Sequence, residues 1–129
     1  MKEAPVVSIV DDDQSVREGI VDLVKAMGFD AETFERAENF LQSDIDRTAC
    51  LITDMRMPGM TGLELYDRLV ALGKRIPTIV ITAFPKDGDR KRAQQAGVVC
   101  YLAKPFDERH LVDCIASALG PGAAGKGRS

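Results

Sequence analysis

The stretch that decides the fold is Leu51-Ile52-Thr53-Asp54-Met55-Arg56-Met57-Pro58-Gly59, an apolar run that ends in an acid and a Pro-Gly turn. Such a run is typical of a strand buried on both faces of a parallel sheet. Asp54 then lies at the carboxyl end of the strand, where open α/β sheets place their chemistry. Because a buried carboxylate is costly unless other groups compensate its charge, we expect further functional side chains around Asp54.

Similar apolar runs recur along the chain and alternate with helical patterns. Five strands are predicted, at 6–10, 31–34, 49–54, 78–82 and 98–102. Strands that alternate with helices specify a parallel sheet covered on both faces. We therefore predict a doubly wound α/β fold with the flavodoxin-like strand order 2-1-3-4-5, in which the more polar strand 31–34 lies at an edge.

The segments between these strands show the periodicity of helices. Apolar residues recur at helical spacing over 16–27, and further helices are predicted over 36–41, 62–72 and 107–119. Thr61 is placed to cap the third of these helices. Residues 86–96 offer two alanines as apolar anchors, so this segment is either a solvated surface helix or a mobile element that responds to the site.

Length and composition indicate one globular domain. A chain of 129 residues with 45% hydrophobic and 29% charged residues is ordinary for such a domain. The net charge of -3, without a long basic run, argues against nucleic-acid binding by this chain alone. No apolar run approaches the roughly 18 residues of a membrane span, and the N-terminus lacks a signal segment. We expect a cytoplasmic protein with no membrane partner.

The end of the chain differs in composition from the rest. Residues 120–129 are rich in Gly and Ala and cannot bury a core, so we assign 1–119 to the domain and 120–129 to a flexible linker or tail. A linker here indicates either a second domain beyond it or a loose terminus.

The cysteines and the histidine carry no recognisable motif. Cys50, Cys100 and Cys114 are odd in number and far apart, so small buried thiols are expected rather than a metal or redox site. His110 has no second histidine or cysteine nearby, and we assign it no role.

The predicted strand order gathers acids into one pocket. The first and third strands are neighbours, so Asp11, Asp12 and Asp54 meet at their carboxyl ends. The fourth and fifth strands bring Thr82 and Lys104 to the same rim. Carboxylates this close raise one another's pKa, and a divalent cation would relieve the repulsion. Oxygen ligands alone favour Mg²⁺, or a similar hard ion such as Mn²⁺, over zinc.

Phosphoryl chemistry is the natural use of such a pocket, because Mg²⁺ commonly joins carboxylates to phosphate oxygens. Asp54 is the expected nucleophile, since a carboxylate attacks phosphorus without a base. Lys104 would pair with the phosphoryl oxygens, and the Thr82 hydroxyl would donate a hydrogen bond to one of them. Asp13 has two interpretations, a further acid of the site or only a cap of the helix that follows.

Four motifs follow one another along the chain. They are Val10-Asp11-Asp12-Asp13, Asp54-Met55-Arg56-Met57-Pro58-Gly59-Met60-Thr61-Gly62, Ile81-Thr82-Ala83 and Tyr101-Leu102-Ala103-Lys104-Pro105-Phe106. In this order and spacing they resemble the receiver domain of two-component response regulators, and the resemblance covers nearly the whole chain, from Val6 to Leu119. The spacing is most similar to the FixJ-type branch, which usually carries a helix-turn-helix output domain. Thr61 departs from the family, which commonly has Asp there.

The resemblance implies that Asp54 accepts phosphate from a sensor histidine kinase. It implies a Mg²⁺ held by Asp12, Asp54 and the main-chain carbonyl of Arg56, with Asp11 acting largely through water. The protein would then be a signalling switch that catalyses only its own phosphorylation and dephosphorylation.

The resemblance also implies how the signal leaves the site. Thr82 and Tyr101 would form the switch pair, Lys104 would contact the phosphoryl group, and the Lys104-Pro105 bond is expected to be cis. The output would be a homodimer formed through the fourth helix, fifth strand and fifth helix. A DNA-binding output domain is expected outside this chain. A stand-alone receiver and the amino-terminal part of a transcription factor both remain open, and the linker favours the second.

Two other classes of protein share parts of this pattern. A Mg²⁺-dependent aspartyl-phosphate hydrolase typically needs a second acid two residues after its nucleophile, where this chain has Arg56. A flavin carrier on the same fold would need a Ser-, Thr- or Gly-rich phosphate loop after the first strand, where Asp11-Asp12-Asp13 would repel the phosphate. The sequence therefore favours the switch over both alternatives.

Overall fold

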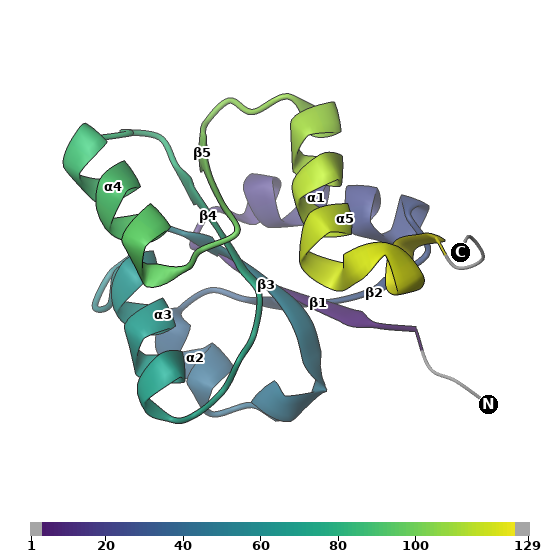
Figure 1. Cartoon of the computed structure of the whole chain (residues 1–129), viewed down its shortest axis with the longest axis horizontal. Helices are drawn as coiled ribbons and strands as arrows, with labels where there is room; N and C mark the ends of the chain where they lie inside the picture. Colours follow the sequence, from purple (N-terminus) through teal and green to yellow (C-terminus); the bar gives the residue numbers. More distant parts are fainter. Residues whose placement is uncertain (1–3, 126–129) are drawn as a thin grey trace.

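One sheet of five parallel strands forms the centre of the protein (Figure 1). The computed structural model describes residues 4–125, with side chains as far as Gly120. The strands are β1 (Val6–Val10), β2 (Asp30–Phe34), β3 (Thr48–Asp54), β4 (Thr78–Thr82) and β5 (Cys100–Ala103). Their order is β2-β1-β3-β4-β5, which confirms the predicted flavodoxin-like topology and places β2 at an edge.

Helices cover both faces of the sheet (Figure 1). One face carries α1 (Gln14–Ala26) and α5 (Glu108–Gly125), and the other carries α2 (Ala37–Leu41), α3 (Gly62–Ala71) and α4 (Asp87–Ala96). A short 3₁₀ turn, η1 (Ile45–Arg47), leads into β3. Within the part of the chain that the structure describes, no helix is long and apolar enough to cross a membrane.

The alternation of side chains along the strands divides the core between the two faces. Ile9 and Ile52 belong to the cluster under α1 and α5, whereas their neighbours Val10 and Leu51 belong to the cluster under α2 and α3. A third, smaller cluster under α3 and α4 contains Tyr101. Because both faces are buried, β1, β3 and β4 are almost continuously apolar, as the sequence predicts.

The predicted boundaries differ from the structure mainly around β5 and at the end of the chain. β5 begins at Cys100 rather than at Val98, because Gly97 ends α4 with a φ of 101° and the Val98 amide still bonds back to the Ala93 carbonyl. The last helix was predicted to end at 119. Helical backbone continues to Gly125 after an interruption at Gly120, where φ is 85°. Residues 126–129 of the predicted linker lie outside the described part.

The prediction of three unpaired thiols is wrong for two of the cysteines. Cys100 on β5 and Cys114 on α5 form a disulfide, with their Cα atoms 6.2 Å apart. Their spacing in the sequence gives no sign of this pairing, because the two residues meet once α5 folds back over β5. Cys50 is a free buried thiol, as expected, and burial raises its pKa to about 12.

Candidate functional site

Three carboxylates meet at the carboxyl ends of β1 and β3. These strands are neighbours, so the acids that end them fall side by side. Asp11 and Asp54 are buried and Asp12 is exposed, and one carboxylate oxygen from each lies within 4.8 Å of the others. The structure thus brings together the three acids that the strand order predicted.

Asp11 is held rigidly from several sides. Its carboxylate accepts hydrogen bonds from the Asp13 amide at 2.9 Å and from the Lys104 ammonium at 3.1 Å. Its main-chain carbonyl accepts a bond of 2.7 Å from the guanidinium of Arg17, a supporting residue that the sequence did not reveal. Asp13 turns out to be the cap of α1, since its side chain accepts from the Ser15 amide at 2.9 Å.

Lys104 reaches into the acidic pocket from the end of β5. Its Nζ lies 3.1 Å from Asp11 Oδ2 and 3.3 Å from Asp54 Oδ1. The Lys104 amide donates to the Thr82 carbonyl at 2.7 Å, and the Lys104-Pro105 bond is cis, as expected. Burial lowers the pKa of Lys104, but its hydrogen bonds and charge contacts with the two carboxylates outweigh this and leave the pKa above its ordinary value. The ammonium is therefore a permanent positive charge in the pocket.

The pocket disfavours the ionised form of Asp54. Burial and the charge of Asp11 raise its pKa to about 6, and the nearby Lys104 counteracts this only in part. Three carboxylates therefore face one ammonium, and the donors are all hard oxygen atoms. A divalent cation would offset the excess negative charge, so these residues fit Mg²⁺ or Mn²⁺.

The two predicted switch residues lie on neighbouring strands: Thr82 is the last residue of β4, whereas Tyr101 lies within β5 and pairs with Val80. Thr82 is fully buried, and its hydroxyl oxygen accepts a bond of 3.1 Å from the Phe84 amide. The side chain of Tyr101 is 8% exposed and packs in the small cluster under α3 and α4. Among the described residues, no group forms a hydrogen bond with its buried hydroxyl. Arg56, whose carbonyl was assigned to the metal, is exposed in the loop after β3.

Gly62 supports the site in a way that the sequence did not reveal. It begins α3 directly beneath the end of β3, and its amide donates to the Met55 carbonyl at 2.9 Å. A Cβ at this position would lie 2.5 Å from the Asp54 carbonyl oxygen. Only glycine therefore allows the helix to approach the peptide that carries Asp54 so closely. The signal in the sequence is a glycine immediately after the capping residue Thr61.

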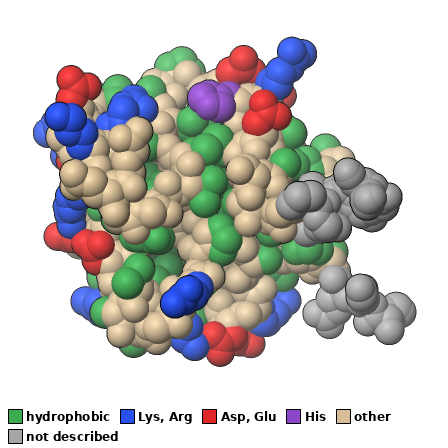
Figure 2. Space-filling model, viewed as in Figure 1, with side chains coloured by type: hydrophobic (Ala, Val, Ile, Leu, Met, Phe, Trp, Pro, Cys, Tyr) green, Lys and Arg blue, Asp and Glu red, His purple; other side chains and the backbone are tan. Residues whose placement is uncertain are grey.

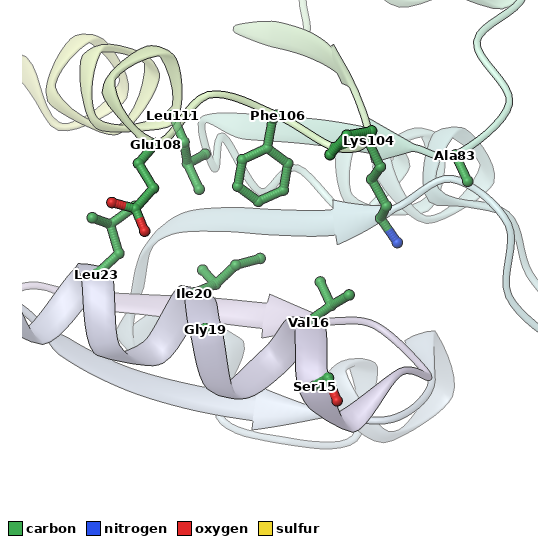
Figure 3. Close-up of a pocket in the computed structure, with 11 residues that line it drawn as sticks. Ser15, Val16, Gly19, Ile20, Leu23, Ala83, Lys104, Phe106, Glu108 and Leu111 are labelled. Atoms are coloured by element: carbon green, nitrogen blue, oxygen red, sulfur yellow. The ribbon is translucent and has the colours of Figure 1, made fainter.

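An apolar groove of about 550 Å³ opens beside Lys104, between α1 and α5 (Figure 3). Val16 and Ile20 line it from α1, and Phe106 and Leu111 face them from the other side. Figure 3 shows Lys104 at one end of the groove. The surface next to the acids is thus apolar on this side.

The sequence matches a known protein family over most of its length. A family model, described as the response regulator receiver domain, matches residues 7–116. The chain belongs to the response regulator receiver family. This receiver is 41% identical over 118 residues to Response regulator protein TodT of Pseudomonas putida, covering 90% of this chain and 52% of TodT. It is 37% identical over 113 residues to Transcriptional regulatory protein FixJ of Rhizobium meliloti, covering 87% of this chain and 55% of FixJ.

Solved receiver structures are similar in fold and in sequence. The crystal structure of FixJ-N superimposes with a TM-score of 0.81 and 36% identity, covering 92% of this receiver and 95% of FixJ-N. The response regulator StyR gives a TM-score of 0.83 and 44% identity, covering 90% of this receiver and 59% of that chain. The predicted resemblance to FixJ-type receivers is thereby confirmed. The receiver spans about half the length of the curated relatives it matches.

Proposed function

We propose that this receiver is a Mg²⁺-dependent phosphorylation switch in which Asp54 accepts a phosphoryl group from the phosphohistidine of a sensor kinase. The observation that carries the proposal is the position of Lys104, whose Nζ is within 3.3 Å of Asp54 and 3.1 Å of Asp11 in a mostly buried pocket. An ammonium so placed can pair with a phosphoryl group on Asp54 without a large movement of its own.

The transfer itself needs little from the protein besides position and charge. A carboxylate oxygen of Asp54 forms a bond to phosphorus while the bond between phosphorus and the imidazole nitrogen breaks, and the imidazole takes up a proton. Lys104 stays charged and exchanges part of its contact with Asp54 for a phosphoryl oxygen. The bound Mg²⁺ would neutralise the phosphoryl oxygens, held by Asp12, Asp54 and the carbonyl of Arg56, with Asp11 acting through water.

The readout would pass through Thr82 and Tyr101. Phosphorylation adds about -1.5 to -2 charges at Asp54, and the Thr82 hydroxyl is a donor of suitable type at the neighbouring strand end. Movement of Thr82 toward the phosphoryl group would favour the inward position of the Tyr101 ring. The switch thus biases two states that exist before phosphorylation rather than creating a new one.

The output of this switch lies beyond the receiver. Relatives that are about twice as long include proteins named as transcriptional regulators, so we propose a DNA-binding output domain as the partner in cis. A homodimer through α4, β5 and α5 would connect the switch to that domain. Residues 120–129 would serve as the linker, and the protein would act in the cytoplasm.

Labelling of Asp54 tests the proposal. The receiver is incubated with Mg²⁺ and acetyl phosphate, and the phosphorylated fraction is measured by mass spectrometry and by lability to hydroxylamine. We expect labelling of the wild type and of Asp113→Asn, an exposed control on α5, but not of Asp54→Asn. EDTA should prevent labelling. An unlabelled wild type in the presence of Mg²⁺ would refute the switch, and rapid multiple turnover would favour the hydrolase instead.

A further inference from the structure

Helix α4 is attached to the rest of the receiver mainly by polar contacts. Among its described side chains, Ala93 alone is buried. Figure 2 shows charged side chains of both signs at the upper left, where α4 lies in Figure 1. The Arg92 guanidinium forms an ion pair of 2.8 Å with Asp67 on α3. A helix with few buried apolar contacts needs little free energy to open locally, so the loss of one contact can change its position.

Arg90 makes two contacts with the same residue of β5. Its guanidinium carbon lies 5.0 Å from the centroid of the Tyr101 ring, and one of its terminal nitrogens donates to the Tyr101 carbonyl at 3.2 Å. β5 is the edge strand next to β4, so its outer side is open to a side-chain donor. The hydrogen bond fixes the guanidinium, and the fixed guanidinium covers the ring by a cation–π contact.

The inward position of the ring has both a favourable and an unfavourable feature. Its apolar part packs against Met55, Leu63, Val80 and Ala93. Its hydroxyl is buried and has no hydrogen-bond partner in the described part of the chain, which opposes the inward position. When favourable and unfavourable terms are close in size, a single additional contact determines which ring position is populated.

We propose that Arg90 is a positioning residue that holds the Tyr101 ring inward and makes the position of α4 depend on that ring. The inference rests on the proposed role of Tyr101 as the switch residue. When the ring turns outward, the guanidinium loses its stacking surface and keeps only its hydrogen bond to the Tyr101 carbonyl, so the attachment of α4 to β5 weakens. In a receiver whose fourth helix has almost no apolar anchor, this contact links the switch residue to the output face.

The tyrosine content of the chain permits a direct test. The chain has two tyrosines and no tryptophan, so 3-fluorotyrosine in a Tyr66→Phe background gives a single ¹⁹F resonance from Tyr101. Its solvent exposure is measured by relaxation from a soluble gadolinium chelate, without phosphorylation. Arg90→Ala should lower the ratio of inward to outward ring by about two- to fivefold, the range expected for a cation–π contact at an exposed site. Arg90→Lys should restore part of this ratio.

Arg92→Ala is the matched control, because it removes an ion pair of α4 that does not involve Tyr101. We expect it to change the ¹⁹F signal of Tyr101 much less than Arg90→Ala does, while hydrogen exchange of the α4 amides accelerates in both variants. An unchanged signal in Arg90→Ala, or an equal change in Arg92→Ala, would overturn the inference. Failure of the switch itself would appear separately, as a wild-type Tyr101 signal that does not respond to beryllofluoride and Mg²⁺.

Discussion

Replacement of Asp54 by Asn should stabilise the Mg²⁺-free receiver, and by an amount that depends on pH. The folded protein holds the pKa of Asp54 at about 6 instead of 3.8, so the ionised acid opposes folding. Below pH 4 both the folded and the unfolded chain carry the proton, and there is no penalty. Between pH 4 and 6 only the folded chain holds it, so stability falls as pH rises. Above pH 6 the penalty is complete.

The size of the effect follows from the same values. A pKa that rises from 3.8 to about 6 destabilises the fold by about 3 kcal/mol at pH 8 and by about 1 kcal/mol at pH 4.5. The Asp54 side chain is 8% exposed, so solvent screens little of this. Asn carries no charge at either pH and can still accept a hydrogen bond from Lys104. Asp54→Asn should therefore raise the free energy of unfolding, relative to the wild type, by about 3 kcal/mol at pH 8 but only by about 1 kcal/mol at pH 4.5.

Urea denaturation in EDTA at the two pH values measures the difference directly. Asp113→Asn, an exposed acid on α5, provides the control and should show no such dependence on pH. Addition of Mg²⁺ should stabilise the wild type more than the variant, by up to about 2.7 kcal/mol at one hundred times Kd. If Asp54→Asn changed stability equally at pH 4.5 and pH 8, the electrostatic account of the pocket would be wrong.

Three further predictions concern glycine packing, helix capping and the disulfide, and each is tested by urea denaturation. Gly62→Ala should lower the free energy of unfolding by about 1–3 kcal/mol, because the new Cβ would lie 2.5 Å from a backbone oxygen. Gly19→Ala, where α1 has open space for a Cβ, should raise the free energy of unfolding by up to about 1 kcal/mol. Similar effects at both sites would contradict the packing argument. Thr61→Ala should lower the free energy of unfolding by about 1 kcal/mol, because it removes the capping box of α3. An unchanged urea midpoint would show that the cap is dispensable. Dithiothreitol should lower the stability of the wild type by up to about 3 kcal/mol, since the bridge closes a separation of 14 residues, but should have no effect on a Cys100→Ala, Cys114→Ala double variant.

The parts of the fold that depend on local pattern could be predicted from the sequence. The apolar run before Asp54 and its counterpart before Asp11 identified two central strands. The alternation with helices indicated a parallel sheet, and the common order for a small sheet of this kind, 2-1-3-4-5, is the one the structure shows. From that order the meeting of Asp11, Asp12 and Asp54 followed without any structural information. Lys104 could be placed at the same rim because it follows an apolar strand and precedes proline.

The parts that depend on side chains meeting across the fold could not be predicted. Arg90 stacks on Tyr101 and Cys100 meets Cys114 only after α4 and α5 have packed against β5. Neither pairing leaves a periodic trace in the sequence. The catalytic and switch roles of Thr82 and Tyr101 remain predictions, because they concern a phosphorylated state.

The disulfide between β5 and α5 has a mechanical consequence for the face formed by α4, β5 and α5. Cys100 is adjacent to Tyr101 in β5, and Cys114 lies in the middle of α5, so the covalent link joins the strand and the helix into one body. A rotation of α5 against the sheet is thereby restrained, while α4 on the other side of β5 is held by guanidinium contacts. The two helices beside β5 are thus attached to it differently, α5 by a covalent bond and α4 by noncovalent contacts.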